Sequence, residues 1–419
     1  MQAVSASVQI VASFIIGDIA QRVGSIKWCI IALFLLSFAG NFLYSCASTI
    51  SLSTILGGRI LCGVASASGA LIYSYITAIH KERTKVFKFV SAYRTASGFF
   101  MAISQLVAIF ASYCDFKIHN FKVNSNNGPT FVCSFIILAV TALLVFVLEN
   151  PAVPTKKTSM SFTKALQGFF SAPKWTLAGG IILLWGMFFA SFLMSEVVYF
   201  MPVFLTESLG WETKFQGVAF MVASIIGICG SLVFPHLIEM PIRKKEKEFN
   251  SQAESQLKLS EKSDISHNSE ESADRKQEFE AYKKNALYNN QIVLSLVSLL
   301  IALVGQAFMI GAAQVFRHRS LPHINTGCFF VGGMSLVMLA YNGMASTFPA
   351  LFSVYIDPQV KLQLMPAIGA VAALGKLIAP IVLSNLYQTK LGLSIAVGLG
   401  MILTALTLMP VFLLKDKKH

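Results

Sequence analysis

The sequence contains few charged residues. Only 13% of its 419 residues are Asp, Glu, Lys or Arg, whereas 55% are hydrophobic. A typical soluble domain is about 25% charged. A soluble fold of this length cannot hide so much apolar surface, so most of that surface must face lipid. The composition therefore predicts a polytopic membrane protein and excludes an ordinary soluble domain.

Signals for metal or redox chemistry are also missing. The seven cysteines form no C-x-x-C pair and have no zinc-type spacing with histidine. No P-loop, G-x-G-x-x-G, G-x-S-x-G or H-E-x-x-H motif occurs in a suitable context. We therefore expect no enzyme activity, no cofactor and no metal site.

Long apolar runs are what the sequence has in abundance. A run of about 20 mostly apolar residues is a candidate transmembrane helix. We place eleven such spans at residues 1–16, 28–47, 52–79, 88–112, 130–148, 175–205, 215–238, 288–314, 327–355, 362–387 and 391–414. The expected fold is an all-α polytopic membrane protein.

The formal charge of +13 lies mainly in short loops on one side of these spans. In a soluble protein such a charge would suggest nucleic acid, but here it marks orientation, and we expect no nucleic-acid partner. The positive-inside rule places the basic loops and the C-terminus in the cytosol. Residues 240–287 form the longest polar stretch and contain few branched apolar residues, so we expect a disordered cytosolic loop there.

The first joint carries a recognisable motif. Residues 17–24, GDIAQRVG, resemble the loop G-x-L-A-D-R-x-G that joins helices two and three in the major facilitator superfamily. Gly17, Ala20, Arg22 and Gly24 match the motif, and Gln21 replaces its Asp. The resemblance implies that Gly17, Arg22 and Gly24 belong to a gating loop, in which the neutral Gln21 weakens an ionic latch.

Later segments extend the resemblance along the chain. The R-x-L-x-G pattern at Arg59, the Ser74-Tyr75 pair and the run 82–84 (ERT) look like the lysosomal branch typified by domain-containing protein 8 of this superfamily. Glu196 in the seventh family helix and the stretch 375–380 (GKLIAP) in the eleventh add to it. The resemblance implies an endolysosomal membrane location.

The family fold has twelve helices in two bundles. The resemblance makes the eleven spans family helices two to twelve. We therefore expect the first helix to be missing, either because the gene model is truncated or because the protein lacks this helix. It implies an incomplete N-terminal bundle at 1–149, a cytosolic linker at 150–174 and a C-terminal bundle at 175–419.

Three charged side chains inside the spans stand out: Arg59, Glu196 and Lys376. A charge at mid-bilayer is costly, so each is a functional candidate. We expect the three to line one cavity, with Glu196 as a proton-coupling group and the two bases suited to an anion. Structural alternatives stay open: an ion-paired Glu196, a packing role for Arg59 and a snorkelling Lys376.

Two spans contain residues that often interrupt helices. Asn342 and Gly343 lie in one, and Gly375 and Pro380 in the next. We expect discontinuous helices there, because freed backbone carbonyls often form binding sites. Ordinary membrane packing is the alternative, since Gly and Pro are common in spanning helices.

Together these patterns favour a secondary transporter that moves a small solute by alternating access, with proton coupling as a further hypothesis. Its expected partners are the lipid bilayer and a small molecule or ion. The alternatives are an anion channel on the same fold and a non-transporting receptor or scaffold.

Overall fold

The molecule is described here from a computed structural model. The description covers residues 2–48, 51, 53–80, 82–111, 113, 116–118, 121–124, 127–151, 162–260, 268–318, 323–356, 361–387 and 392–414.

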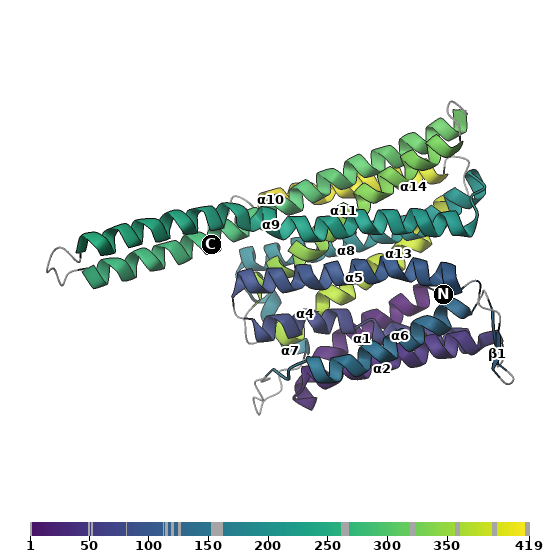
Figure 1. Ribbon diagram of the computed structural model, residues 1–419, viewed down its shortest axis with the longest axis horizontal. Helices are drawn as coiled ribbons and strands as arrows, with labels where there is room; N and C mark the ends of the chain where they lie inside the picture. The colour runs from purple at the N-terminus through teal and green to yellow at the C-terminus, as the bar shows by residue number, and fades with distance from the viewer. Residues whose placement is uncertain are drawn as a thin grey trace.

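The first half of the chain is almost entirely helical (Figure 1). Its elements are α1 (Gln2–Val23), α2 (Ile26–Ser45), the 3-10 turn η1 (Cys46–Ser48), α3 (Ser53–Ala65), α4 (Ser68–Ile79), α5 (Arg83–Ala111), the antiparallel strands β1 (Phe116–Ile118) and β2 (Phe121–Val123), and α6 (Gly128–Val147). Helices α3 and α4 together form one membrane span. The small hairpin β1–β2 between α5 and α6 was not expected from the sequence.

The second half contains the longer helices. They are α7 (Phe162–Phe170), α8 (Lys174–Val203), the π-helical turn η2 (Phe204–Ser208), α9 (Thr213–Ser260), α10 (Asn268–His318), α11 (His323–Tyr355), α12 (Lys361–Leu364), α13 (Pro366–Tyr387) and α14 (Gly392–Leu413). The described residues of both halves include eleven helices long and apolar enough to cross a membrane, which confirms the expected number.

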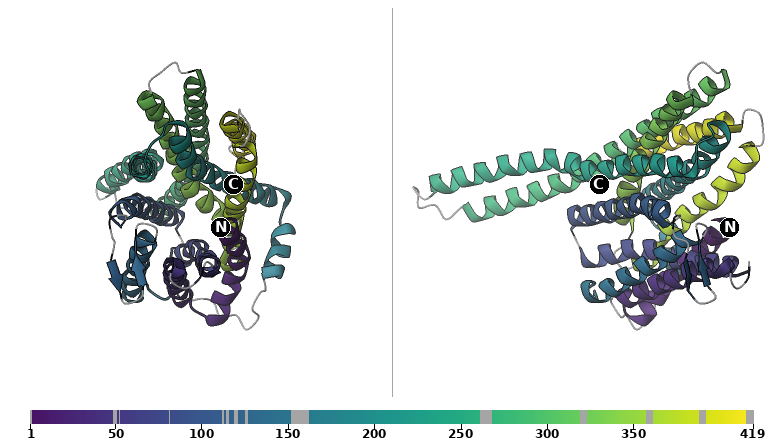
Figure 2. Two further views of the ribbon diagram at one scale, coloured as in Figure 1. Left: turned by 90° about the vertical axis from the view of Figure 1, so that its right-hand side faces the viewer. Right: turned by 45° about the vertical axis from the view of Figure 1, so that its right-hand side comes forward.

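The spans form two bundles that meet along two helix pairs. In the first bundle α2 packs against α3 and α6, and in the second α8, α9 and α10 all pack against α11. Between the bundles α1 lies along α13, and α5 lies along α9. The views in Figures 1 and 2 show the purple and blue helices of the first half on one side of this boundary and the green and yellow helices on the other. The expected two-bundle architecture is therefore confirmed.

The turn between α1 and α2 shows why the loop motif needs its last glycine. Gly24 follows α1 directly and has a φ of 68°, in the left-handed region that costs other residues energy. Its N–H donates to the carbonyl of Gln21 at 3.2 Å. Ser25 then caps α2, because its side chain accepts a hydrogen bond from the N–H of Trp28 at 3.3 Å. The two helices consequently reverse direction within two residues.

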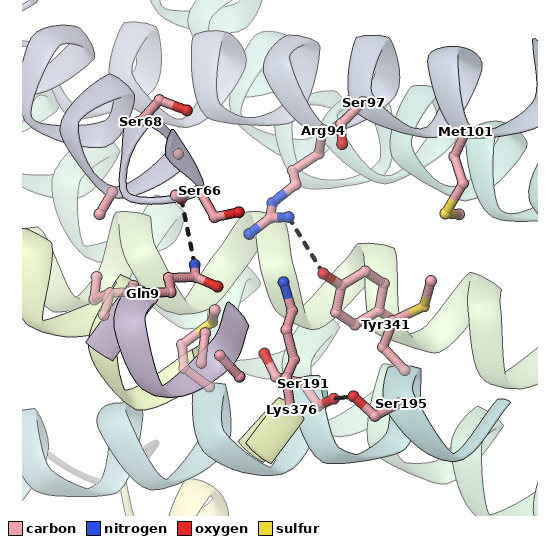
Figure 3. A pocket seen from close by; sticks show the side chains of 18 of the residues that line it. Gln9, Ser66, Ser68, Arg94, Ser97, Met101, Ser191, Ser195, Tyr341 and Lys376 are labelled. Carbon is pink, nitrogen blue, oxygen red and sulfur yellow. Dashed lines mark hydrogen bonds between the residues drawn. The ribbon is translucent and has the colours of Figure 1, made fainter. Parts of the chain in front are cut away.

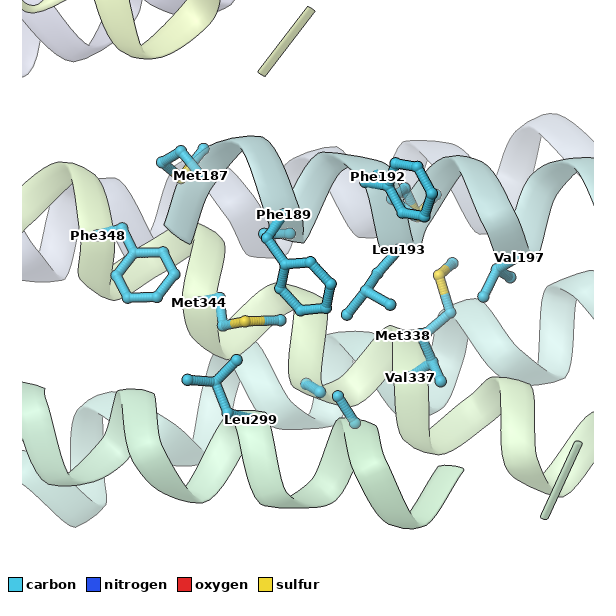
Figure 4. Close-up of a cluster of buried hydrophobic side chains, with 14 of the residues drawn as sticks. Met187, Phe189, Phe192, Leu193, Val197, Leu299, Val337, Met338, Met344 and Phe348 are labelled. Carbon is cyan, nitrogen blue, oxygen red and sulfur yellow. The ribbon is translucent and has the colours of Figure 1, made fainter. Parts of the chain in front are cut away.

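The second bundle has the denser apolar core. Figure 4 shows Phe189 and Leu193 of α8 facing Leu299 of α10 and Met344 of α11. All four side chains are at most 1% exposed. The first bundle is more open: α2, α4, α5 and α6 line an apolar groove of about 710 Å³. The second bundle is thus the more firmly packed frame for a site.

Residues 240–287 differ from the expected disordered loop. Helices α9 and α10 run past the other spans and form an antiparallel pair that projects from the bundle (Figure 1). The Phe249 ring stacks on that of Phe279 at 4.7 Å, and Lys283 pairs with Glu246 at 3.7 Å. The composition is polar, as the sequence shows, but each helix supplies the other with aromatic and ionic partners. Residues 261–267 lie outside the described part of the chain.

The expected helix breaks are also not found. Helix α11 runs continuously through Asn342 and Gly343, and α13 runs through Gly375 and Pro380. The glycines instead allow close approach: a Cβ on Gly343 would lie 2.1 Å from the Ser298 Oγ, and one on Gly375 would lie 2.3 Å from the carbonyl oxygen of Phe188. Helix packing therefore explains these residues better than discontinuity does.

Candidate functional site

A cavity of about 500 Å³ lies between the two bundles. Helices α1, α3, α4 and α5 line it from the first bundle, and α8, α11 and α13 line it from the second. Such a position suits a substrate site, because both bundles can contact the same solute. Figure 3 shows the labelled side chains that converge there.

The lining of this cavity is strongly basic. Arg59, Arg94 and Lys376 all contribute to it, and none of the described residues around the cavity is Asp or Glu. The remaining polar groups are hydroxyls and amides, including Gln9, Ser191, Ser195 and Asn342. The cavity consequently carries uncompensated positive charge.

Arg94 on α5 lies inside a ring of tyrosines. Its Nη1 donates a hydrogen bond to the Tyr341 hydroxyl of α11 at 3.3 Å. Its guanidinium carbon lies 5.4 Å from the ring centre of Tyr73 and 5.8 Å from the ring centres of Tyr93 and Tyr341. Its Nε has no hydrogen-bond partner. The aromatic faces stabilise the cation without neutralising it, so the guanidinium retains charge and a free donor for a ligand.

Lys376 enters the cavity from the opposite bundle. Figure 3 shows its side chain pointing from α13 toward Arg94 and the Tyr341 hydroxyl. No ion pair of Lys376 occurs among the described residues. Two cations from different bundles thus face the same part of the cavity.

Arg59 lies at another part of the cavity wall, on α3. Its guanidinium carbon is 4.6 Å from the ring centre of Tyr44, and its Nε has no hydrogen-bond partner. The structure therefore brings Arg59 and Lys376 to the same cavity, as expected.

Glu196, in contrast, faces away from this cavity. On α8, Met194, Ser195 and Val198 line the cavity, whereas Glu196 is 1% exposed and points toward α10 and α14. One helical residue corresponds to a rotation of about 100°, which is enough to place neighbours in sequence on different faces. The expected grouping of the three charged residues is therefore wrong for Glu196.

Arg94 is not among the residues predicted from the sequence, although a signal for it is present there. The residue lies inside the span placed at 88–112, so counting every charged residue in each span would have found it. Tyr93 precedes Arg94 on the same helix, but Tyr341 comes from α11, far away in the chain, and spacing alone does not indicate that they meet.

The loop motif lies where the bundles touch at their basic ends. Gly17 packs against the chain entering α13, where a Cβ would be 2.8 Å from the carbonyl oxygen of Leu362. The Gln363 Nε2 donates to the Gln21 Oε1 at 2.7 Å, so an amide pair occupies the position of the family's acidic residue. Arg22 is exposed. The Gln21–Gln363 pair is thus a neutral contact between the bundles at this position.

An ion cluster joins the bundles on the other side of the same end. The Lys88 Nζ of α5 lies 3.1 Å from the Glu239 Oε1 of α9, and the Arg243 Nη2 lies 2.8 Å from Glu239 Oε2. Glu239 is only 7% exposed. The Lys88–Glu239 pair ties α5 to α9, and Arg243 holds the carboxylate from the same helix.

Comparison with known proteins identifies the family. The family model described as Major Facilitator Superfamily matches residues 1–247, which is more than half of the chain. The chain belongs to the Major Facilitator Superfamily. It is an integral, multi-pass MFS-type transporter and not an enzyme.

Individual relatives agree with this assignment. The MFS-type transporter PUL3 of Kluyveromyces lactis is 50% identical over 418 residues, which cover 100% of this chain and 88% of PUL3. Among solved structures, the human organic anion transporter MFSD10 has a TM-score of 0.63 at 13% identity, covering 99% of this chain and 83% of its own. The fucose:proton symporter FucP of E. coli has a TM-score of 0.63 at 12% identity, covering 99% and 91%. The two structural matches show a shared fold.

The expected lysosomal branch is not supported. That expectation rests on short motifs and single residues, whereas the relative PUL3, 50% identical over 100% of this chain, is a yeast transporter whose name mentions no lysosome. Short motifs that place residues at helix ends occur across a superfamily and distinguish its branches poorly.

Proposed function

We propose that this protein is a secondary transporter that carries a small organic anion through the cavity between its bundles. The observation that carries the proposal is the charge of the cavity lining: Arg59, Arg94 and Lys376 contribute to it, and no described lining residue is acidic. Unpaired cations inside a membrane protein are costly unless a ligand compensates them. An anionic solute supplies that compensation on binding.

The volume and the donors of the cavity fit this class of solute. A cavity of about 500 Å³ accommodates a small organic molecule but is too small for a polymer. Arginine offers a planar set of donors to a carboxylate, sulfonate or phosphate, and lysine adds a compact charge. The organic anion named in the description of MFSD10, which shares the fold, is in line with this class.

Alternating access is the mechanism we propose for movement. The basic end is held shut by the Lys88–Glu239 pair and the Gln21–Gln363 pair, each of which joins one bundle to the other. Transport would require these contacts to separate while the opposite end closes around the solute. Their modest individual strength suits contacts that must break in every cycle.

The test uses pairs of solutes that differ in charge but little in shape. Purified protein is heated with benzoate or benzamide, and with succinate or succinamide, and the melting temperature is compared. A ligand that binds the folded state raises this temperature. The anionic member of a pair is expected to stabilise the protein and its neutral partner is not, and Arg94→Gln should abolish the difference. Equal stabilisation by the amides would overturn an anion-selective site.

A further inference from the structure

A second polar site lies inside the second bundle, behind α8. Glu196 is 1% exposed, and it lies on a different face of α8 from Ser191 and Ser195, which line the substrate cavity. The carboxyl group is thus close to the cavity in sequence but separated from it by the helix itself. Nothing in the proposed anion-binding chemistry uses it.

An amide side chain contacts the carboxyl group, and a hydroxyl group in turn contacts that amide. The Gln306 Nε2 of α10 donates to the Glu196 Oε2 at 3.4 Å, and the Thr404 hydroxyl of α14 donates to the Gln306 Oε1 at 2.9 Å. Gln306 and Thr404 are both 0% exposed. The Glu196 Oε1 has no hydrogen-bond partner. One oxygen of a fully enclosed carboxyl group is therefore available for a further ligand.

A glycine brings the third helix close. A Cβ on Gly400 of α14 would lie 2.6 Å from the Glu196 Oε2 and 2.4 Å from the Gln306 Nε2, well inside van der Waals contact. Any other residue would force the helix or both polar side chains to move. The close approach of α14 at this point is what completes the enclosure.

Among the described residues, Glu196 takes part in no ion pair. The α10 segment from Tyr288 to Val315 and the whole of α14 contain no charged residue, and α8 contains none besides Glu196 between Trp175 and Val203. Among the titratable groups on the segments packed against α8, Tyr341 of α11 and Lys376 of α13 face the substrate cavity, whereas Cys328 of α11 and Glu207 of η2 are exposed. Tyr355 instead hydrogen-bonds to Tyr288. On α8 itself the remaining titratable side chain near the site is Tyr199.

We propose that Glu196, enclosed by Gln306, Thr404 and Gly400, is a proton-binding site of the transport cycle that is separate from the anion site. An ionised carboxylate without a partner is strongly unfavourable in this environment, whereas a carboxylic acid is neutral and can donate its own hydrogen. A metal ion fits less well, because Gln306 presents a donor to the carboxylate and Gly400 has no room even for a methyl group. The inference rests on the proposed transport function for its role, but not for the protonation itself.

The site's position suggests how proton and solute are linked. One face of α8 lines the substrate cavity, and another face carries Glu196. A shift of α8 that accommodates an anion therefore also moves Glu196 relative to α10 and α14. Release transfers the proton from the carboxyl group to water and leaves a carboxylate, which must then reach water or another donor. Each arrangement of α8 therefore favours one protonation state.

The experiment needs no substrate. Melting temperatures of the purified wild-type protein are measured from neutral to mildly alkaline pH. The folded state favours the neutral acid and the unfolded chain ionises freely, so stability should fall as pH rises. Glu196→Gln replaces the acid with a neutral amide of the same shape and should lose this slope. Glu239→Gln, which removes another carboxylate of the same bundle, should keep it.

Infrared spectroscopy gives an independent readout at neutral pH. The C=O band of a protonated carboxyl group is expected in the wild type and in Glu239→Gln but not in Glu196→Gln.

A further variant serves if Glu196→Gln fails to fold. Gln306→Leu removes the carboxylate's only described donor, so its melting temperature should fall more steeply with rising pH than that of the wild type.

Three outcomes would overturn the inference. They are an unchanged pH slope in Glu196→Gln, a carboxyl band that survives this substitution, and stabilisation by sodium over choline that depends on Glu196. The last would indicate a metal-ion site. Because solute binding is not part of either readout, a failure of the anion proposal would leave both results intact.

Discussion

The guanidinium of Arg94 donates a hydrogen bond to the Tyr341 hydroxyl across the boundary between the two bundles, with 3.3 Å between Nη1 and the oxygen. Arg94 belongs to α5 and Tyr341 to α11, so the bond lies in the path that separates when the bundles move apart. An anion that binds Arg94 competes with or adds to this contact. In the proposed transport, Arg94 therefore takes part both in solute binding and in a contact that changes when the bundles move.

Arg94 is the substitution for which we expect the largest loss of binding. Arg94→Gln removes the charge, and a hydrogen bond to a charged group is worth about 1.5–3 kcal/mol, so affinity for an anion should fall roughly tenfold or more. Arg94→Lys keeps the charge but loses the planar donors, so its affinity for the anion should lie between those of the wild type and Arg94→Gln. Calorimetric titration with the stabilising anion measures these affinities. Equal affinities of the three proteins would show that the anion binds elsewhere.

Substitution of Lys376 should change anion affinity without changing the stability of the unliganded protein. It has no described ion pair, so Lys376→Met removes an uncompensated cation and is expected to weaken anion binding without lowering the melting temperature of the unliganded protein. Lys376→Arg serves as the control that keeps the charge. A strongly destabilised methionine variant would instead point to a structural role for this lysine.

Glu239 should control access at the basic end. Glu239→Gln weakens its pairs with Lys88 and Arg243, and we expect the basic end to open more often. Because Lys88 is about half exposed, the change should be modest, at about 0–1 kcal/mol, or a few-fold in population. Labelling of a cysteine at Ser231, which meets Ser91 between α5 and α9, reports the opening. The double exchange Lys88→Glu with Glu239→Lys should restore slow labelling, and faster labelling in that variant would argue against the pair as a latch.

Gly375 should tolerate no side chain. Gly375→Ala would place a Cβ 2.3 Å from the carbonyl oxygen of Phe188, a backbone atom of α8 that cannot rotate away, so a destabilisation of about 1–3 kcal/mol is expected. Gly398→Ala is the matched control, because nothing lies within 4 Å of the added carbon. Thermal unfolding in one detergent compares them. Similar melting temperatures would mean that α8 and α13 are more loosely packed than described.

The projecting pair of α9 and α10 gives a test of orientation. The basic loops predict that this end faces the cytosol. A cysteine at Glu248, in an otherwise cysteine-free protein, should react with a membrane-impermeant maleimide only after the membrane is opened. A cysteine at Tyr113, at the far end of α5, should react in intact cells. Reversed labelling of the two positions would invert the topology.

Hydropathy predicted the spans well because lipid acts on every helix in the same way. Length and apolar composition decide whether a run of residues can cross the bilayer, and these two properties alone predict the eleven spans. Rotation about each helix axis is different, since it depends on neighbouring helices that hydropathy does not describe. This is why the presence of Glu196 in a span was predictable and its orientation away from the cavity was not.

Polar segments and small residues were harder to interpret than apolar runs. The composition of residues 240–287 predicts disorder, but the Phe249–Phe279 stack exists only when two such helices meet. The sequence also predicts helix breaks at Gly343 and Gly375, yet each lies where another helix comes too close for a side chain. In both cases the decisive partner is distant in sequence.

The basic cavity also has an electrical consequence. Fixed positive charges held within a bilayer experience the transmembrane voltage, at about 2.3 kcal/mol for each charge moved through 100 mV. A bound anion cancels part of the charge contributed by Arg59, Arg94 and Lys376. In the proposed anion transport, the empty protein then moves more net charge through the field than the loaded one when it reorients. We therefore expect the membrane potential to act chiefly on the return of the empty carrier.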